Sequence, residues 1–89
     1  MENTNNAPTN LVSFVCALCA EKDGRKVFAT IEDWTYGGPE EASGNYRAAF
    51  KYAVRALENW LYNDAPAAFL SNLRAADNAA RAWEEENMS

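Results

Sequence analysis

The first third of the chain holds two apolar runs, residues 11–20 and 27–36, separated by a polar stretch that contains Asp23-Gly24. Both runs are rich in β-branched and aromatic residues, and Asp-Gly tolerates the positive φ angles of a tight hairpin turn. We therefore predict an antiparallel β-hairpin, with Gly37-Gly38-Pro39 ending its second strand.

A two-residue turn would pair Lys22 with Arg25 and so decide which side chains share a face of the hairpin. One face then carries aliphatic side chains from both strands and is the predicted core. The other face, the aromatic sheet face, carries Phe28, Glu32, Trp34 and Tyr36. A three-residue turn would shift the pairing by one residue, so the choice of face depends on the turn.

From Tyr46 onward the apolar residues recur at steps of three and four, which predicts helices. The first helix is expected to end near Asn63, and its apolar stripe is Tyr46, Phe50, Ala53, Leu57, Trp60 and Leu61. Asp64 is expected to cap a second helix with Pro66 in its first turn. The stripe of that helix is Phe69, Leu70, Leu73, Ala76, Ala80 and Trp83.

The predicted fold class is α+β: a two-stranded hairpin followed by an antiparallel helix pair, ββαα, in one compact domain over residues 11–89. Residues 1–10, rich in Asn and Thr, are expected to form a flexible tail. Two helices can cover only one face of a two-stranded sheet. The other face and the sheet edges are thus candidate binding surfaces.

The charge balance favours a basic partner. Thirteen acidic and eight basic residues give a net charge of −5 and a pI near 4.6, so direct binding to nucleic acid is not expected. The candidate acidic contacts are Asp33, Glu40, Glu41, Glu84, Glu85 and Glu86. A basic stripe, Arg47, Lys51 and Arg55, is the alternative that would serve a nucleic-acid binder.

Nothing in the sequence favours catalysis. Histidine is absent, and no nucleophile motif, phosphate loop or metal-ligand cluster is present, so we expect no enzyme activity, no cofactor and no metal. Cys16 and Cys19 would point to opposite faces of a strand and are expected to be packing residues in a reducing, cytoplasmic setting. The apolar run 11–20 is half the length of a membrane-spanning helix, about 20 residues.

These observations predict a non-enzymatic protein-binding module, an inhibitor that docks on a larger, basic, nucleic-acid-handling protein or complex. In size, acidity and lack of catalytic groups the chain is similar to the small phage and mobile-element proteins that block host defence, such as anti-CRISPR and anti-restriction inhibitors. That similarity covers no motif and implies no residue roles. One alternative is a homo-oligomeric structural or regulatory subunit, antitoxin-like or adaptor-like, that pairs through sheet edges. A weaker alternative is a nucleic-acid binder.

Overall fold

The computed structural model describes residues 10–36 and 44–88, and within these ranges every regular element is a helix. In chain order they are α1 (Leu11–Ala20), α2 (Gly24–Tyr36), α3 (Gly44–Glu58), the π-helical turn η3 (Asn59–Asn63) and α4 (Pro66–Met88). The predicted tail falls almost wholly outside the described residues, as do Glu40 and Glu41.

The ββαα prediction is wrong, because the two segments expected to form the hairpin are α1 and α2. In α1 the buried residues are Leu11, Val15, Leu18 and Cys19, and in α2 they are Val27 and Ile31. These residues recur at steps of three and four, which puts them on one face of a helix, whereas in a strand Leu18 would lie on the face opposite Leu11 and Val15. Packing of this helical stripe outweighs the preference of β-branched and aromatic residues for strands.

The Asp23-Gly24 pair starts a helix and is not a hairpin turn. The Oδ1 atom of Asp23 accepts a hydrogen bond of 3.0 Å from the backbone N–H of Arg25, as an N-cap residue does. Its carbonyl oxygen accepts the amides of Lys26 and Val27. Lys22, with φ of 55°, makes the left-handed turn that ends α1.

The two helices predicted after residue 46 are present as α3 and α4. Pro66 is the first residue of α4, a position where a missing backbone N–H breaks no hydrogen bond within the helix. Asp64 does not cap α4. Its backbone has left-handed φ and ψ angles, and its backbone N–H donates a hydrogen bond to the carbonyl oxygen of Asn59, which ends η3. The side chains of Asn59 and Asn72 also join the two helices through a 2.7 Å hydrogen bond.

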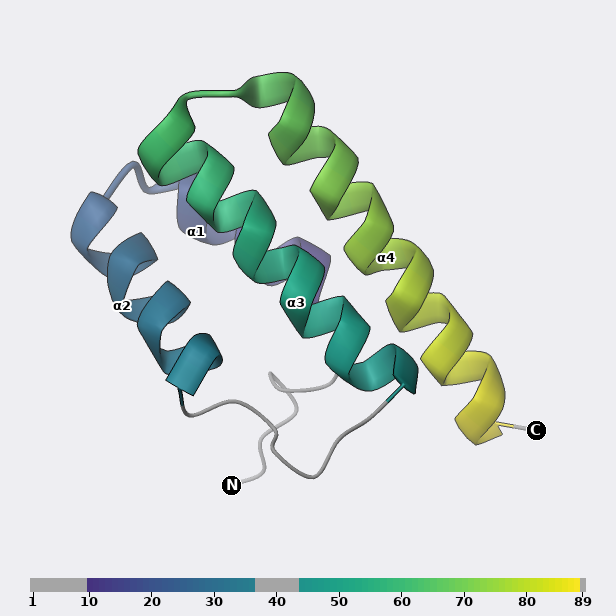
Figure 1. Ribbon diagram of the computed structural model, residues 1–89. Coiled ribbons are helices and arrows are strands. Elements are labelled where there is room, and N and C mark those ends of the chain that lie inside the picture. Colours follow the sequence, from purple (N-terminus) through teal and green to yellow (C-terminus); the bar gives the residue numbers. More distant parts are fainter. Residues whose placement is uncertain (1–9, 37–43, 89) are drawn as a thin grey trace.

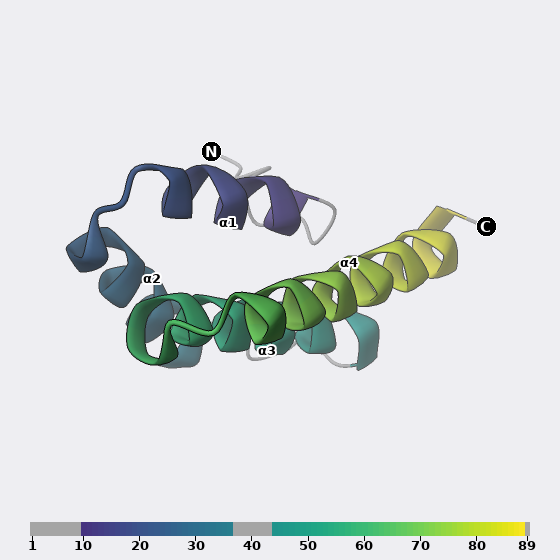
Figure 2. The ribbon, with the colours of Figure 1, turned by 90° about the horizontal axis from the view of Figure 1, so that it is seen from above.

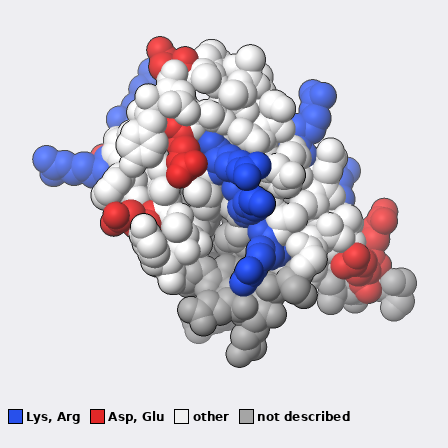
Figure 3. Space-filling view, viewed as in Figure 1, with Lys and Arg blue, Asp and Glu red and all other residues white. Residues whose placement is uncertain are grey.

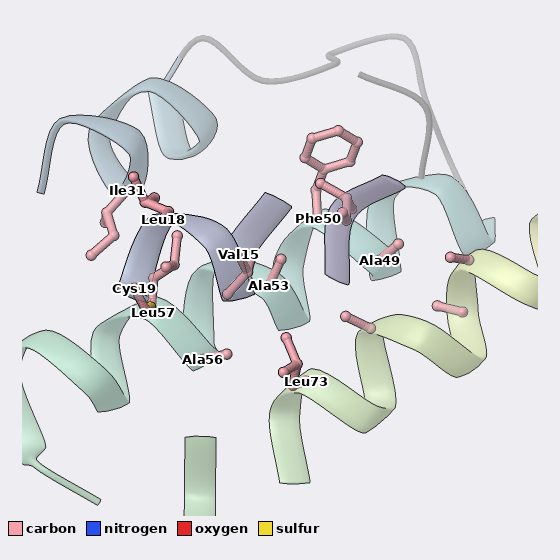
Figure 4. Close-up of a cluster of buried hydrophobic side chains, with 14 of the residues drawn as sticks. Val15, Leu18, Cys19, Ile31, Ala49, Phe50, Ala53, Ala56, Leu57 and Leu73 are labelled. Carbon is pink, nitrogen blue, oxygen red and sulfur yellow. The ribbon is translucent and has the colours of Figure 1, made fainter. Parts of the chain in front are cut away.

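The helices form two layers. Helices α3 and α4 lie antiparallel and side by side, and α2 lies beside α3 (Figure 1). Helix α1 forms the second layer and covers one face of the α3–α4 pair (Figure 2). The core lies between these layers, where Val15 and Leu18 of α1 meet Ala53 and Leu57 of α3 (Figure 4).

Among the described residues, no helix covers the opposite face of the α3–α4 pair, which faces the reader in Figure 1. We refer to this as the open face of the pair.

The cap on α2 gives a first test of the fold. We expect Asp23→Ala to lower the free energy of unfolding by about 1 kcal/mol, because the backbone N–H of Arg25 loses its side-chain acceptor. Asp23→Asn keeps an acceptor oxygen and should stay close to the wild type. Urea unfolding followed by the helical circular-dichroism signal measures both. An unchanged free energy of unfolding in the Asp23→Ala protein would contradict the capping role.

Candidate partner-binding surface

Helix α2 has one face in the core and one in solvent. Val27 and Ile31 are buried against the rest of the molecule. Beside these residues and turning away from them, Phe28, Glu32 and Tyr36 follow one another at steps of four residues, which aligns them along the helix. Phe28 is 45% exposed and Tyr36 is 80% exposed. We call Phe28, Glu32 and Tyr36 the α2 outer face.

The aromatic sheet face predicted from the sequence does not exist as a unit, because Trp34 points inward. Its ring centroid lies 5.6 Å from that of Phe14 and 5.4 Å from that of Phe50, the latter at an interplanar angle of 85°. Such edge-to-face pairs are favourable beyond the burial of their area. Trp34 therefore joins α2 to α1 and α3, and only Phe28, Tyr36 and Glu32 remain at the surface.

The ring contacts continue through the molecule. Phe50 stacks on Tyr46 at 5.3 Å, and Tyr46 meets Trp83 of α4 edge-on at 5.6 Å. This aromatic chain, Phe14–Trp34–Phe50–Tyr46–Trp83, runs through all four α-helices. Burial raises the pKa of the Tyr46 hydroxyl, so this ring stays neutral at physiological pH.

The predicted acidic contacts lie in two separate places. Asp33 is exposed on α2, next to the α2 outer face. Glu84, Glu85 and Glu86 are exposed near the C-terminal end of α4, on the far side of α3 from α2 (Figure 1). The Oε2 atom of Glu86 accepts a 2.9 Å hydrogen bond from Asn45 at the start of α3.

The predicted basic stripe is intact. Arg47, Lys51 and Arg55 are all exposed on α3 at steps of four residues. Figure 3 shows Lys and Arg side chains in a row along α3, on the open face of the α3–α4 pair. The Arg55 guanidinium lies over the ring of Tyr52, 5.5 Å from its centroid.

The surface also holds large apolar side chains outside the α2 outer face. Leu70 is 62% exposed although the helical pattern assigned it to the buried stripe, and Tyr62 in η3 is exposed as well. For Tyr62, the π-helical turn shifts the register of the side chains after α3, and a 3.6-residue pattern cannot anticipate that shift.

The two cysteines lie three residues apart on a helix, so they do not point to opposite faces as a strand would require. Cys19 is buried and Cys16 is exposed, so only Cys19 serves as a packing residue. Burial is the main cause that raises the pKa of the Cys19 thiol to about 11, and the neighbouring Cys16 adds to it.

No family model, no curated protein and no solved structure matches the chain. Within residues 10–36 and 44–88, no group of three or more His, Cys, Asp or Glu residues could hold a metal ion. No helix in the same ranges is long and apolar enough to span a membrane.

The two sides of α2 should respond differently to substitution. We expect Trp34→Ala to lower the free energy of unfolding by about 2–4 kcal/mol, because it removes the ring that connects three helices. Phe28→Ala should cost less than about 1 kcal/mol, since much of that ring is already in water. Urea unfolding of the two variants measures the difference, and equal losses would contradict the inward placement of Trp34.

The cysteines should differ in reactivity. At about pH 8 we expect a thiol reagent to modify Cys16 readily and Cys19 only slowly, because the buried thiol is protonated and covered. Comparing the Cys16→Ser and Cys19→Ser variants assigns the two rates, and denaturant should make both thiols react. Fast modification of the Cys16→Ser protein under native conditions would show that α1 does not stay packed.

Proposed function

We propose that this protein is a non-enzymatic binding module whose α2 outer face docks on a larger protein with a basic surface. The observation that supports this most directly is the exposure of Phe28 and Tyr36 on either side of Glu32, on a helix whose other face is fixed in the core. Large exposed aromatic side chains on a rigid element are typical of the centre of a protein interface.

The charges beside these rings support a basic partner. Glu32 lies between the two rings along the helix, and Asp33 is the next residue. No basic residue occurs in α2 after Lys26. Burying the rings against a partner would supply most of the affinity, while the carboxylates would select a partner with Lys or Arg at matching positions and speed the encounter.

A partner that handles nucleic acid fits this surface, because such proteins carry the basic grooves that carboxylates can occupy. Occupying such a groove would make the protein an inhibitor of that partner, as in phage and mobile-element proteins that act against host defence. The competing proposal of a subunit that pairs through sheet edges has no sheet edge to use, since residues 10–36 and 44–88 contain no strand.

The proposal can be tested with a photo-crosslinking amino acid placed on the α2 outer face. We expect benzoylphenylalanine at Phe28 or Tyr36 to crosslink one specific host protein in cells that produce this chain. The matched controls carry the same group at Tyr62 or Leu70, which are exposed apolar positions on η3 and α4. Crosslinking from the control positions to the same protein with equal yield would contradict docking through α2.

The crosslinked protein is then purified and its dissociation constant is measured. We expect the Phe28→Ala/Tyr36→Ala variant to bind at least about tenfold more weakly, and Tyr62→Ala/Leu70→Ala to bind as the wild type does. Glu32→Gln/Asp33→Asn should weaken the salt dependence of association. Trp34 is left unchanged, because its loss would disturb the fold. Binding of the Phe28→Ala/Tyr36→Ala variant within twofold of the wild type would overturn the proposal.

A further inference from the structure

Helix α1 carries both thiols of the chain. Cys16 is exposed, whereas Cys19, three residues later, is buried. In an α-helix the Cα atoms of residues three apart lie about 5 Å from each other, given the radius and the rise of the helix. A disulfide joins Cα atoms that are about 4.4–6.8 Å apart. The backbone of α1 therefore already holds the two cysteines at a distance that a disulfide can bridge.

The side chains of the two cysteines do not yet meet the geometry of a disulfide. The Cβ atoms of residues three apart on a helix are separated by about 5–6 Å, but those of a disulfide by about 3.5–4.5 Å. Closing this gap has to deform the last turn of α1, to which Cys19 belongs. Two backbone hydrogen bonds hold that turn, from Glu21 to the carbonyl of Leu18 at 3.2 Å and from Lys22 to the carbonyl of Cys19 at 3.0 Å. A Cys16–Cys19 bond and the intact end of α1 thus oppose each other.

The side chain of Cys19 is also part of the core. Cys19 belongs to the buried cluster that contains Leu18 and Leu57, and Figure 4 shows it on the side of α1 that faces α3. Because Cys16 is exposed, a bond between the two draws the buried sulfur outward and leaves unfilled space in the core, which costs free energy. A helix of ten residues depends on such packing for its stability. The loss therefore falls on the contacts that keep α1 in place.

We propose that Cys16 and Cys19 form a redox site that reacts with oxidised low-molecular-weight disulfides such as glutathione disulfide, and that the resulting Cys16–Cys19 bond releases α1 from the α3–α4 pair. In the first step the thiolate of Cys16 attacks one sulfur of the small disulfide, which breaks its S–S bond and expels one small thiolate. The thiolate of Cys19 then attacks Sγ of Cys16 and expels the second small thiolate. The protein loses two electrons and two protons, and the small disulfide takes them up as it is reduced to two thiols.

The two steps differ in what they require of the fold. Cys16 is accessible in the folded protein, so the mixed disulfide forms without movement of α1. Cys19 is covered, and burial raises the pKa of its thiol to about 11, so the folded protein holds very little of the reactive thiolate. The second step therefore proceeds from molecules in which α1 has opened, and the internal disulfide then keeps α1 from packing again.

Release of α1 changes two parts of the molecule. It uncovers the apolar face of the α3–α4 pair that α1 covers (Figure 2). It also takes away the ring of Phe14, whose centroid lies 5.6 Å from that of Trp34 and joins α1 to α2. The redox site is separate from the α2 outer face, and neither proposal requires the other.

The experiment compares the full chain in its reduced and oxidised forms. The protein is incubated with glutathione disulfide at about pH 8, and intact-mass spectrometry distinguishes the mixed disulfide, which gains a glutathionyl group, from the internal disulfide, which loses two hydrogen atoms. We expect the internal disulfide to accumulate. In that form, hydrogen exchange at the amides of residues 11–20 should be at least about tenfold faster than in the reduced protein, while the amides of α4 change by less than about threefold.

A second measurement follows the rate at which the mixed disulfide converts to the internal disulfide. Val15→Ala weakens the packing of α1 and leaves both thiols in place. We expect this variant to convert at least about fivefold faster than the wild type, because the step waits for α1 to open. An unchanged rate would contradict the coupling between the disulfide and α1.

The matched control places the two thiols on the exposed side of the same helix. Ala17 and Ala20 are both exposed and three residues apart, so the Cys16→Ser/Cys19→Ala/Ala17→Cys/Ala20→Cys variant keeps the spacing without a buried sulfur. Its oxidation should speed exchange in residues 11–20 by less than about threefold. The proposal is overturned if the wild type forms no internal disulfide, if exchange in residues 11–20 stays unchanged once that bond has formed, or if α4 or the control variant shows an equal acceleration.

Discussion

The structure depends on the burial of α1 against α3 and α4. A helix of ten residues is not stable alone in water, and α1 has no charged side chain that could form stabilising pairs along its surface. It forms because Leu11, Val15 and Leu18 leave water together, each stabilising the folded state by about 1.5–3 kcal/mol before the cost of ordering the chain. This packing covers one face of the α3–α4 pair and, through a short turn, places α2 beside α3. The outer side of α2 and the open face of the pair are the surfaces that remain.

The sequence predicted half of the fold correctly for an identifiable reason. In α3 and α4 the helical period, the alanine content and Pro66 all indicate the same structure. In α1 and α2 the signals conflict, because Val27, Phe28 and Ile31 favour strands by residue type but helices by spacing. Asp23 is equally ambiguous, since aspartate is common both in hairpin turns and at helix N-caps. Tertiary burial decides such conflicts, and the spacing of Val27, Ile31 and Trp34 was the signal that pointed to the outcome.

The different periods of strand and helix explain which candidate residues stayed together. Residues four apart share a face on a strand, where the period is two, and nearly share one on a helix, where it is 3.6. Phe28, Glu32 and Tyr36 therefore remain aligned although the hairpin was wrong. Trp34 and Tyr36 are two apart and share a face only on a strand, so the helix turns Trp34 into the core. Cys16 and Cys19 show the converse, because a step of three separates side chains on a strand and brings them together on a helix.

Net charge is a poor guide to partners when rigid elements separate the charges. The contact of Trp34 with Phe50 fixes α2 against α3, so the carboxylates of α2 and the cations of α3 keep their places on neighbouring helices. At physiological ionic strength, fields between exposed charges decay over about 8 Å, which is comparable to the spacing of packed helices. A partner at one helix therefore senses mainly that helix. This allows an acidic protein to present an acidic aromatic surface on α2 and a basic row on α3.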